Sequence, residues 1–178
     1  DRLLYLIGER EQVRKRKERG DKKPWTDDHI LRSYRFCNVR RMDDKVSRWL
    51  LENWYLPNFN HPNMLPAVVL ARHFNLPKTL ESIGFPTTWE PDRLKSKLES
   101  LKKLGPVFNA AYIIASNGEP NKSEMVVNLA DKFVRKPPKL NTNSMEKTSE
   151  VLTQYKGFGH FMAGQVVADL RWAMKGNW

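Results

Sequence analysis

Apolar residues recur along most of the chain at the three- and four-residue spacing of short amphipathic helices. Met42, Val46, Trp49 and Leu50 are one such set, and residues 121–136 form another. Strict alternation of apolar and polar residues, which indicates a half-buried strand, does not recur. We expect about seven to nine short helices, over residues 2–19, 26–37, 42–50, 67–74, 91–104, 107–118, 121–136, 144–155 and 160–172.

Proline and glycine mark where these helices begin and end. Pro91 suits a first helical turn, Gly105 follows a last one, and Pro137 ends the helix before it. The stretch 56–66, with three prolines and three asparagines, predicts a loop. Residues 107–118 fit a helix or a strand, and we interpret them as a helix because no second strand is available for pairing.

The predicted fold is therefore all-α and belongs to a single helical domain over residues 1–178. Within it we expect a basic N-terminal helix and linker over 1–24 and a helical hairpin over 144–174. The only cysteine, Cys37, excludes an intramolecular disulfide and a cysteine-based zinc site. No apolar run approaches the roughly 18 residues of a membrane helix, and no signal peptide is recognised, so we expect an intracellular protein.

Positive charge is concentrated near the N-terminus. The whole chain has a formal charge of +11, and residues 10–50 hold 14 basic against 7 acidic residues. A concentrated basic surface attracts polyanions, and nucleic acid is the usual one. A merely soluble basic surface is the alternative interpretation.

The stretch YKGFGHFMAGQVVADLRW, residues 155–172, predicts a helical hairpin with a glycine turn. Gly157 and Gly159 carry no Cβ, so the backbone can turn sharply and approach a partner closely. The amides that follow would sit at a helix N-terminus, which favours an anion such as a DNA phosphate. The predicted DNA contacts are Lys156, Gly157, Gly159 and His160; the alternative is an ordinary turn with glycines chosen for packing.

Behind this turn, Phe161, Met162, Val166 and Leu170 predict a buried stripe. Gln165 and Asp169 are four residues apart and share one helix face. They could be a solvated pair. They could also be functional, with Asp169 as a general base and Gln165 hydrogen-bonding a base edge.

Two motifs together resemble one known family. PWTDDHILRSYRFCNVRRMDDKVSRWL and GFGHFMAGQVVADL are similar to the alpha-glutamyl/putrescinyl thymine pyrophosphorylases, and the resemblance runs from about Trp25 to Trp172. These are helix-hairpin-helix, DNA-glycosylase-like proteins of phage DNA hypermodification, also described as amino acid:DNA transferases and helical partners of 5-hydroxymethyluracil DNA kinases. The resemblance implies a host-cytoplasmic phage enzyme acting on double-stranded DNA with a phosphorylated 5-hydroxymethyl-deoxyuridine (5-hmdU).

In such a reaction an amine from an amino acid or polyamine displaces (pyro)phosphate from the 5-methylene carbon. Cationic groups must then receive the departing phosphate, and Arg35 and Arg40 suit that role. Arg41 and Asn38 complete the expected catalytic set, with Asn38 hydrogen-bonding the base and Asp169 deprotonating the amine. The arginines could instead contact DNA phosphates, and Arg35 could pair with an aspartate. No protein metal site is evident, although Mg²⁺ bridging a pyrophosphate would leave little trace.

The chain departs from related glycosylases at two points. Bifunctional members carry a Schiff-base lysine two residues after the second hairpin glycine, where this chain has Phe161. Their catalytic aspartate lies beyond the hairpin, past Trp178, so we expect truncation at the C-terminus or a substitute role for Asp169. Two alternatives stay open: a monofunctional glycosylase excising a modified base, and a non-catalytic DNA-binding module.

Overall fold

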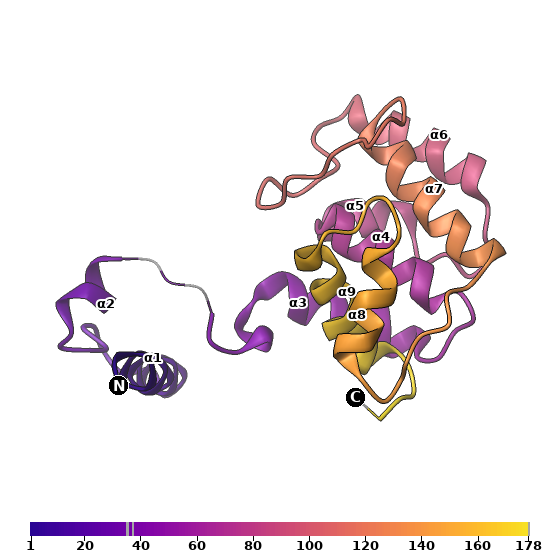
Figure 1. Ribbon diagram of the computed structural model, residues 1–178. Coiled ribbons are helices and arrows are strands. Elements are labelled where there is room, and N and C mark those ends of the chain that lie inside the picture. The colour runs from indigo at the N-terminus through magenta and orange to yellow at the C-terminus, as the bar shows by residue number, and fades with distance from the viewer. Residues whose placement is uncertain (35, 37, 178) are drawn as a thin grey trace. The chain divides into compact units, whose positions relative to one another are not determined.

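All regular structure in the described part of the chain is helical. The computed structural model describes residues 1–34, 36 and 38–177, and these ranges contain no strand. The all-α prediction is confirmed. The α-helices (Figure 1) are α1 (Arg2–Glu18), α2 (His29–Ser33), α3 (Lys45–Leu50), α4 (Met64–Phe74), α5 (Pro77–Ile83), α6 (Pro91–Lys102), α7 (Lys122–Arg135), α8 (Met145–Thr153) and α9 (His160–Ala173), with short helical turns η1 (Arg41–Asp43), η2 (Leu51–Tyr55) and η3 (Leu56–Asn58).

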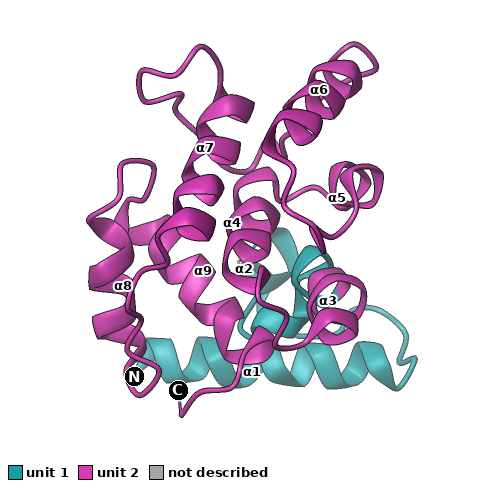
Figure 2. Ribbon diagram, turned by 90° about the vertical axis from the view of Figure 1, so that its right-hand side faces the viewer, with its two compact units in different colours: residues 1–48 teal, residues 49–178 magenta. Residues whose placement is uncertain are grey.

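The chain divides into two compact units, residues 1–48 and residues 49–178 (Figure 2). The first unit contains α1, α2 and η1, and ion pairs cover much of α1. Arg14 contacts both Glu11 and Glu18, at 2.7 and 2.5 Å. No residue of α1 is buried.

The core of the second unit is built around α4. All residues of α4 are buried, and the helix packs against α7 on one side and α9 on another. In turn α8 packs on α9 and α6 packs on α7. Because α4 is enclosed on all faces, its sequence MLPAVVLARHF is apolar apart from Arg72 and His73.

Arg72 is fully buried and is neutralised by a residue of α9. Its Nε and Nη2 donate to the two carboxylate oxygens of Asp169, the second at 2.9 Å, and the Asp169 side chain is 0 % exposed. The hydroxyl of Tyr55 donates to the same carboxylate at 2.6 Å. Burial by itself lowers the pKa of Arg72, but Tyr55 and Asp169 outweigh it and raise the pKa above its usual value. The guanidinium is therefore charged and paired.

Three helix predictions differ from the structure. The helix predicted over 26–37 is the shorter α2, and its N-cap is Asp28. Residues 107–118 form a loop between α6 and α7, so the predicted helix there is wrong. The loop is tied to the end of α4, since the amide N–H of Asn109 donates to the Phe74 carbonyl at 2.9 Å. Helix α5 was not predicted, although Pro77 at its start and Gly84 at its end are the usual signals. Among the described residues, no helix has the length and apolarity of a membrane span.

Replacing Asp169 with asparagine should destabilise the second unit strongly. The change leaves Arg72 charged and buried without its counter-charge, which costs about 3–5 kcal/mol in the free energy of unfolding. Urea denaturation followed by circular dichroism measures this loss. A matched control is Glu90→Gln, because Glu90 pairs with Arg93 at the surface and such pairs contribute at most about 1 kcal/mol. Equal losses in the two variants would contradict the account.

Candidate nucleic-acid interface

A glycine turn joins α8 to α9, and the two helices pack side by side as a hairpin (Figure 1). Gly157 has φ +114°, a backbone conformation that side chains with a Cβ rarely adopt. A Cβ on Gly157 would also lie 3.0 Å from Leu129 Cδ2 and 3.1 Å from Met125 Sδ on α7. The backbone conformation thus favours glycine here, and a Cβ would also require two α7 side chains to shift.

Aromatic packing holds the turn against the core. The buried Phe158 ring meets the His73 ring edge-on, with centroids 5.3 Å apart, and stacks on Phe133 at 6.0 Å. The Nε2 of His73 lies 3.4 Å from the Gly157 carbonyl oxygen, and its Nδ1 lies 2.8 Å from the Val69 carbonyl oxygen. The turn is therefore anchored on both α4 and α7.

Gly159 differs from Gly157 in what surrounds it. It is the N-cap of α9 with φ −88°, and no side chain in the described part of the protein caps this helix. A Cβ added to Gly159 would meet nothing within 4 Å. The described part of the fold therefore does not require glycine at this position. The first backbone amides of α9, together with the helix dipole, form a ready site for an anion.

A cavity of about 560 Å³ opens beside this turn. Its walls come from the loop 111–117, from Met125, and from residues 157–162 of the turn and α9. Ile113 is 98 % exposed and Phe161 is 61 % exposed. The predicted burial of Phe161 is therefore wrong, whereas Met162, Val166 and Leu170 are buried as predicted.

The remaining residues predicted on the hairpin take different positions. Lys156 and His160 are exposed, and the Lys156 ammonium lies 3.4 Å from where a Cβ of Gly118 would stand. Gln165 is half-buried, with its Oε1 3.5 Å from the hydroxyl of Tyr112. The Tyr112 ring contacts Phe161 edge-on at 5.2 Å and lines the cavity. Gln165 thus stands next to the cavity wall.

Asp169, one turn further along α9, is closed to solvent by its contacts with Arg72 and Tyr55. A general base needs hydrogen-bond reach to the proton that it takes. This arrangement gives Asp169 a structural role, and its catalytic role stays a prediction. Sequence spacing alone gave no sign of the pairing, because Arg72 is 97 residues away.

The other predicted catalytic and phosphate-binding residues belong to the first unit. Asn38 and Arg40 are exposed, and the Arg40 guanidinium lies 2.6 Å from the Glu11 carboxylate. Arg41 is half-buried at the start of η1. Arg35 lies outside the described residues. A pocket joining Asn38 and Arg41 to Gln165 and Asp169 stays a prediction.

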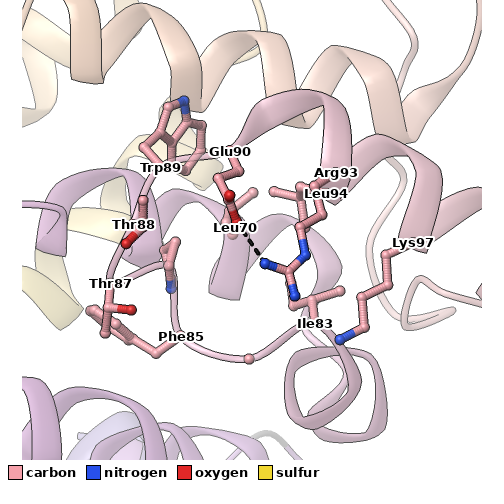
Figure 3. Close-up of a pocket in the computed structure, with 12 residues that line it drawn as sticks. Leu70, Ile83, Phe85, Thr87, Thr88, Trp89, Glu90, Arg93, Leu94 and Lys97 are labelled. Carbon is pink, nitrogen blue, oxygen red and sulfur yellow. Dashed lines mark hydrogen bonds and ion pairs between the residues drawn. The ribbon is translucent and has the colours of Figure 1, made fainter.

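A second cavity, of about 250 Å³, lies between the loop after α5 and helix α6 (Figure 3). Arg93 and Glu90 form an ion pair at 2.8 Å on its rim, and Lys97 points to the same space. Trp89 turns away from it and donates its indole N–H to Asp131 at 2.9 Å. Among the described residues, no group of His, Cys, Asp or Glu has the arrangement of a metal site.

The described part of the chain is thus all-helical, with a glycine turn between α8 and α9. The sequence matches the family described as "5-hmdU DNA kinase, helical domain" over residues 1–178, and the chain belongs to this family. It is 32 % identical over 197 aligned residues to the 5-hmdU DNA kinase of Bacillus phage SP10. The alignment covers 94 % of this chain but 30 % of that relative. No solved structure matches the chain significantly.

The two hairpin glycines should respond differently to alanine. Gly157→Ala forces a strained φ and a contact with α7, and we expect it to lower the free energy of unfolding by about 2 kcal/mol. Gly159→Ala should leave that free energy within about 0.5 kcal/mol of the wild type, because the added methyl group meets no atom. Thermal and urea unfolding measure both changes. A large loss in Gly159→Ala would show that its surroundings are crowded.

Stability should depend on pH through His73. Burial lowers the pKa of His73 below its ordinary value, so the unfolded chain binds the proton more readily. The stabilisation is complete above the unfolded pKa of about 6.5 and is lost as the pH falls through the folded pKa. We expect the free energy of unfolding to fall between pH 7 and pH 5 less steeply in His73→Gln than in the wild type. Identical slopes would contradict this assignment.

Proposed function

We propose that this chain holds DNA at the glycine hairpin and modifies a phosphorylated 5-hmdU base in it by transferring an amine to the base. The observation that carries the proposal is the cavity beside the uncapped N-terminus of α9, with two exposed apolar side chains at its edge. Membership of the helical-domain family supports the choice of 5-hmdU DNA as the substrate.

The hairpin would bind the DNA backbone. The free amides at the start of α9 and the exposed Lys156 offer a phosphate both N–H donors and a positive charge. Gly159, which has no Cβ, lets the phosphate approach these amides closely. Such contacts position the duplex without reading its sequence.

The loop 111–117 would disturb the base stack beside that contact. Apolar side chains inserted between base steps unstack them, and isoleucine is one of the residues used for this. Ile113 has its side chain almost fully in solvent on this loop. A base that leaves the stack needs an aromatic-lined pocket, and Tyr112 and Phe161 supply one with Gln165 next to them.

The chemistry is a substitution at the 5-methylene carbon of the base. The amine nitrogen forms a bond to this carbon, and the bond between this carbon and the (pyro)phosphate oxygen breaks. One proton of the amine passes to a proton acceptor on the protein. Arg35 and Arg40 are the proposed partners of the departing phosphate, with Asn38 and Arg41 assisting at the base. The proton acceptor that we propose is Asp169, which must first leave its contacts with Arg72.

The named relative supports the order of events. A 5-hmdU DNA kinase, by its name, phosphorylates 5-hmdU in DNA, and phosphorylation converts a poor leaving group into a good one. The chain spans about a third of the length of this relative. We propose that the kinase is a partner of this helical region, either fused to it or separate, and that Mg²⁺ could accompany the pyrophosphate.

One observation favours a second candidate, a helical module that binds DNA and presents the base without catalysis. The carboxylate proposed as the general base is buried in an ion pair. The described residues that line the cavity include no carboxylate and no histidine. A module of this kind would need only the hairpin, the exposed loop and the cavity.

A product assay separates the candidates. Duplex DNA containing phosphorylated 5-hmdU is incubated with the chain and a set of amino acids and polyamines, then digested, and its nucleosides are identified by mass spectrometry. We expect a thymidine that bears a new carbon–nitrogen bond. Abasic sites with free base would indicate a glycosylase. Unchanged DNA that still binds the chain would indicate the non-catalytic DNA-binding module.

Four variants test the geometry in the same assay and in duplex binding. Gly159→Ala and Ile113→Ser should each weaken binding to the duplex about tenfold. The first places a methyl group where the phosphate approaches the amides, and the second removes the apolar side chain proposed to enter the base stack. Gln165→Ala should bind normally and lose turnover. For Asp169→Asn, lost turnover counts as evidence for a general base only if the variant is folded under the assay conditions. Full duplex affinity in both Gly159→Ala and Ile113→Ser would contradict the proposed interface.

A further inference from the structure

The first unit contains a groove whose cations and aromatic rings have no role in the proposed function. This groove, of about 680 Å³, lies between α1 and the segment 23–38. Its described lining residues include four cations, Arg10, Lys17, Lys23 and Arg32, and no carboxylate. Three aromatic residues, Trp25, Tyr34 and Phe36, line it as well.

Three cations of this groove differ from several other cations of the unit in their partners. Arg14, Arg16, Arg19 and Arg40 each contact a carboxylate at 3.2 Å or less. Within the described residues, no carboxylate lies within ion-pair distance of Lys17, Lys23 or Arg32. The Lys17 and Lys23 ammoniums instead lie 4.6 and 4.9 Å from the centroid of the Trp25 ring. Lys17, Lys23 and Arg32 are therefore not neutralised by a carboxylate of the described residues.

One aromatic ring of the groove is available for stacking. Tyr34 is 68 % exposed, whereas Trp25 is half-buried and donates its indole N–H to the Asp21 carbonyl at 2.7 Å. Every base has a flat π-face that can stack on such a ring. In a duplex those faces are covered by neighbouring bases, so this ring suits an unpaired base.

We propose that this groove, bordered by Lys17, Lys23, Arg32 and Tyr34, binds single-stranded DNA. The three cations come from α1, from the linker after it and from α2, and they would contact phosphates along the strand. Tyr34 would stack on one base. This interaction is separate from the proposed hairpin contact with duplex DNA and does not depend on amine transfer.

The test measures binding of the full chain to a fluorescein-labelled oligo(dT) of about 12 nucleotides, a length that spans one such groove. In a triple variant the groove cations are replaced, and we expect affinity for the strand to fall more than tenfold. The slope of log affinity against log salt should also decrease in magnitude by about 2, since each phosphate contact contributes about 0.7. The triple variant carries Lys17→Ala, Lys23→Ala and Arg32→Ala.

A matched control removes the same amount of charge elsewhere. Arg19, Arg93 and Arg135 are exposed and each is paired with a carboxylate, so a triple alanine variant at these positions should keep its affinity within about threefold. Equal losses in the two triple variants would show a general effect of charge and would overturn the proposal.

Tyr34 provides a test that does not depend on charge. Tyr34→Ala should weaken strand binding about tenfold, as expected for the loss of one stacked base. Tyr34→Phe keeps an aromatic ring and should bind the strand as tightly as the wild type. Free ATP in the same assay distinguishes a strand from a nucleotide. If ATP binds the groove and displaces the strand at equal or lower concentration, the groove is a nucleotide site and the proposal is wrong.

The hairpin variant separates this inference from the proposed function. Gly159→Ala should keep full affinity for the single strand while losing affinity for the duplex. The triple variant of Lys17, Lys23 and Arg32 (the groove variant) should lose affinity for the single strand and keep its affinity for the duplex. Loss of strand binding in Gly159→Ala, with no effect of the groove variant, would overturn the groove assignment. That result would still leave the hairpin interface intact.

Discussion

The buried contact between Arg72 and Asp169 is the constraint on which the second unit depends. Taking a guanidinium out of water costs several kcal/mol, and only a well-formed pair with further hydrogen bonds offsets that cost. The carboxylate meets two nitrogens of Arg72 and the hydroxyl of Tyr55. Because these groups come from α4, α9 and η2, one polar cluster fixes three elements. The hairpin turn at the start of α9 is then held in a defined place against α4 and α7.

A turn held in this way can present its backbone amides without reorganising. Gly157 allows the close approach to α7, Phe158 fills the space between His73 and Phe133, and Gly159 is left open. Preformed donors lose little freedom when an anion binds, which favours binding. The proposed interface uses this rigidity for the phosphate, and it uses the neighbouring loop with its exposed Ile113 for the base stack. The groove of the first unit would bind a strand whose bases are already unpaired.

Much of the helical framework follows from the sequence, because apolar spacing, proline and glycine act locally. Pro91, Asn121 and Ser144 each stand at or just before the start of a helix. The loop 107–118 could not be predicted this way, because its apolar residues resemble a buried helix. Its conformation depends on a contact with Phe74, which is distant in the sequence and ends α4. Phe161 has the spacing of a core residue yet is exposed beside the cavity. Asp169 has the chemistry of a catalytic group, and only the fold reveals its pairing with Arg72.

Hydrogen exchange measured by mass spectrometry tests the central claim most directly. The full chain is compared with and without duplex DNA that contains phosphorylated 5-hmdU. If the hairpin holds the phosphate and the neighbouring loop contacts the base, amides at 159–162 and 111–115 should become protected when the duplex is added. Unchanged exchange in both segments, with the duplex bound, would contradict the account.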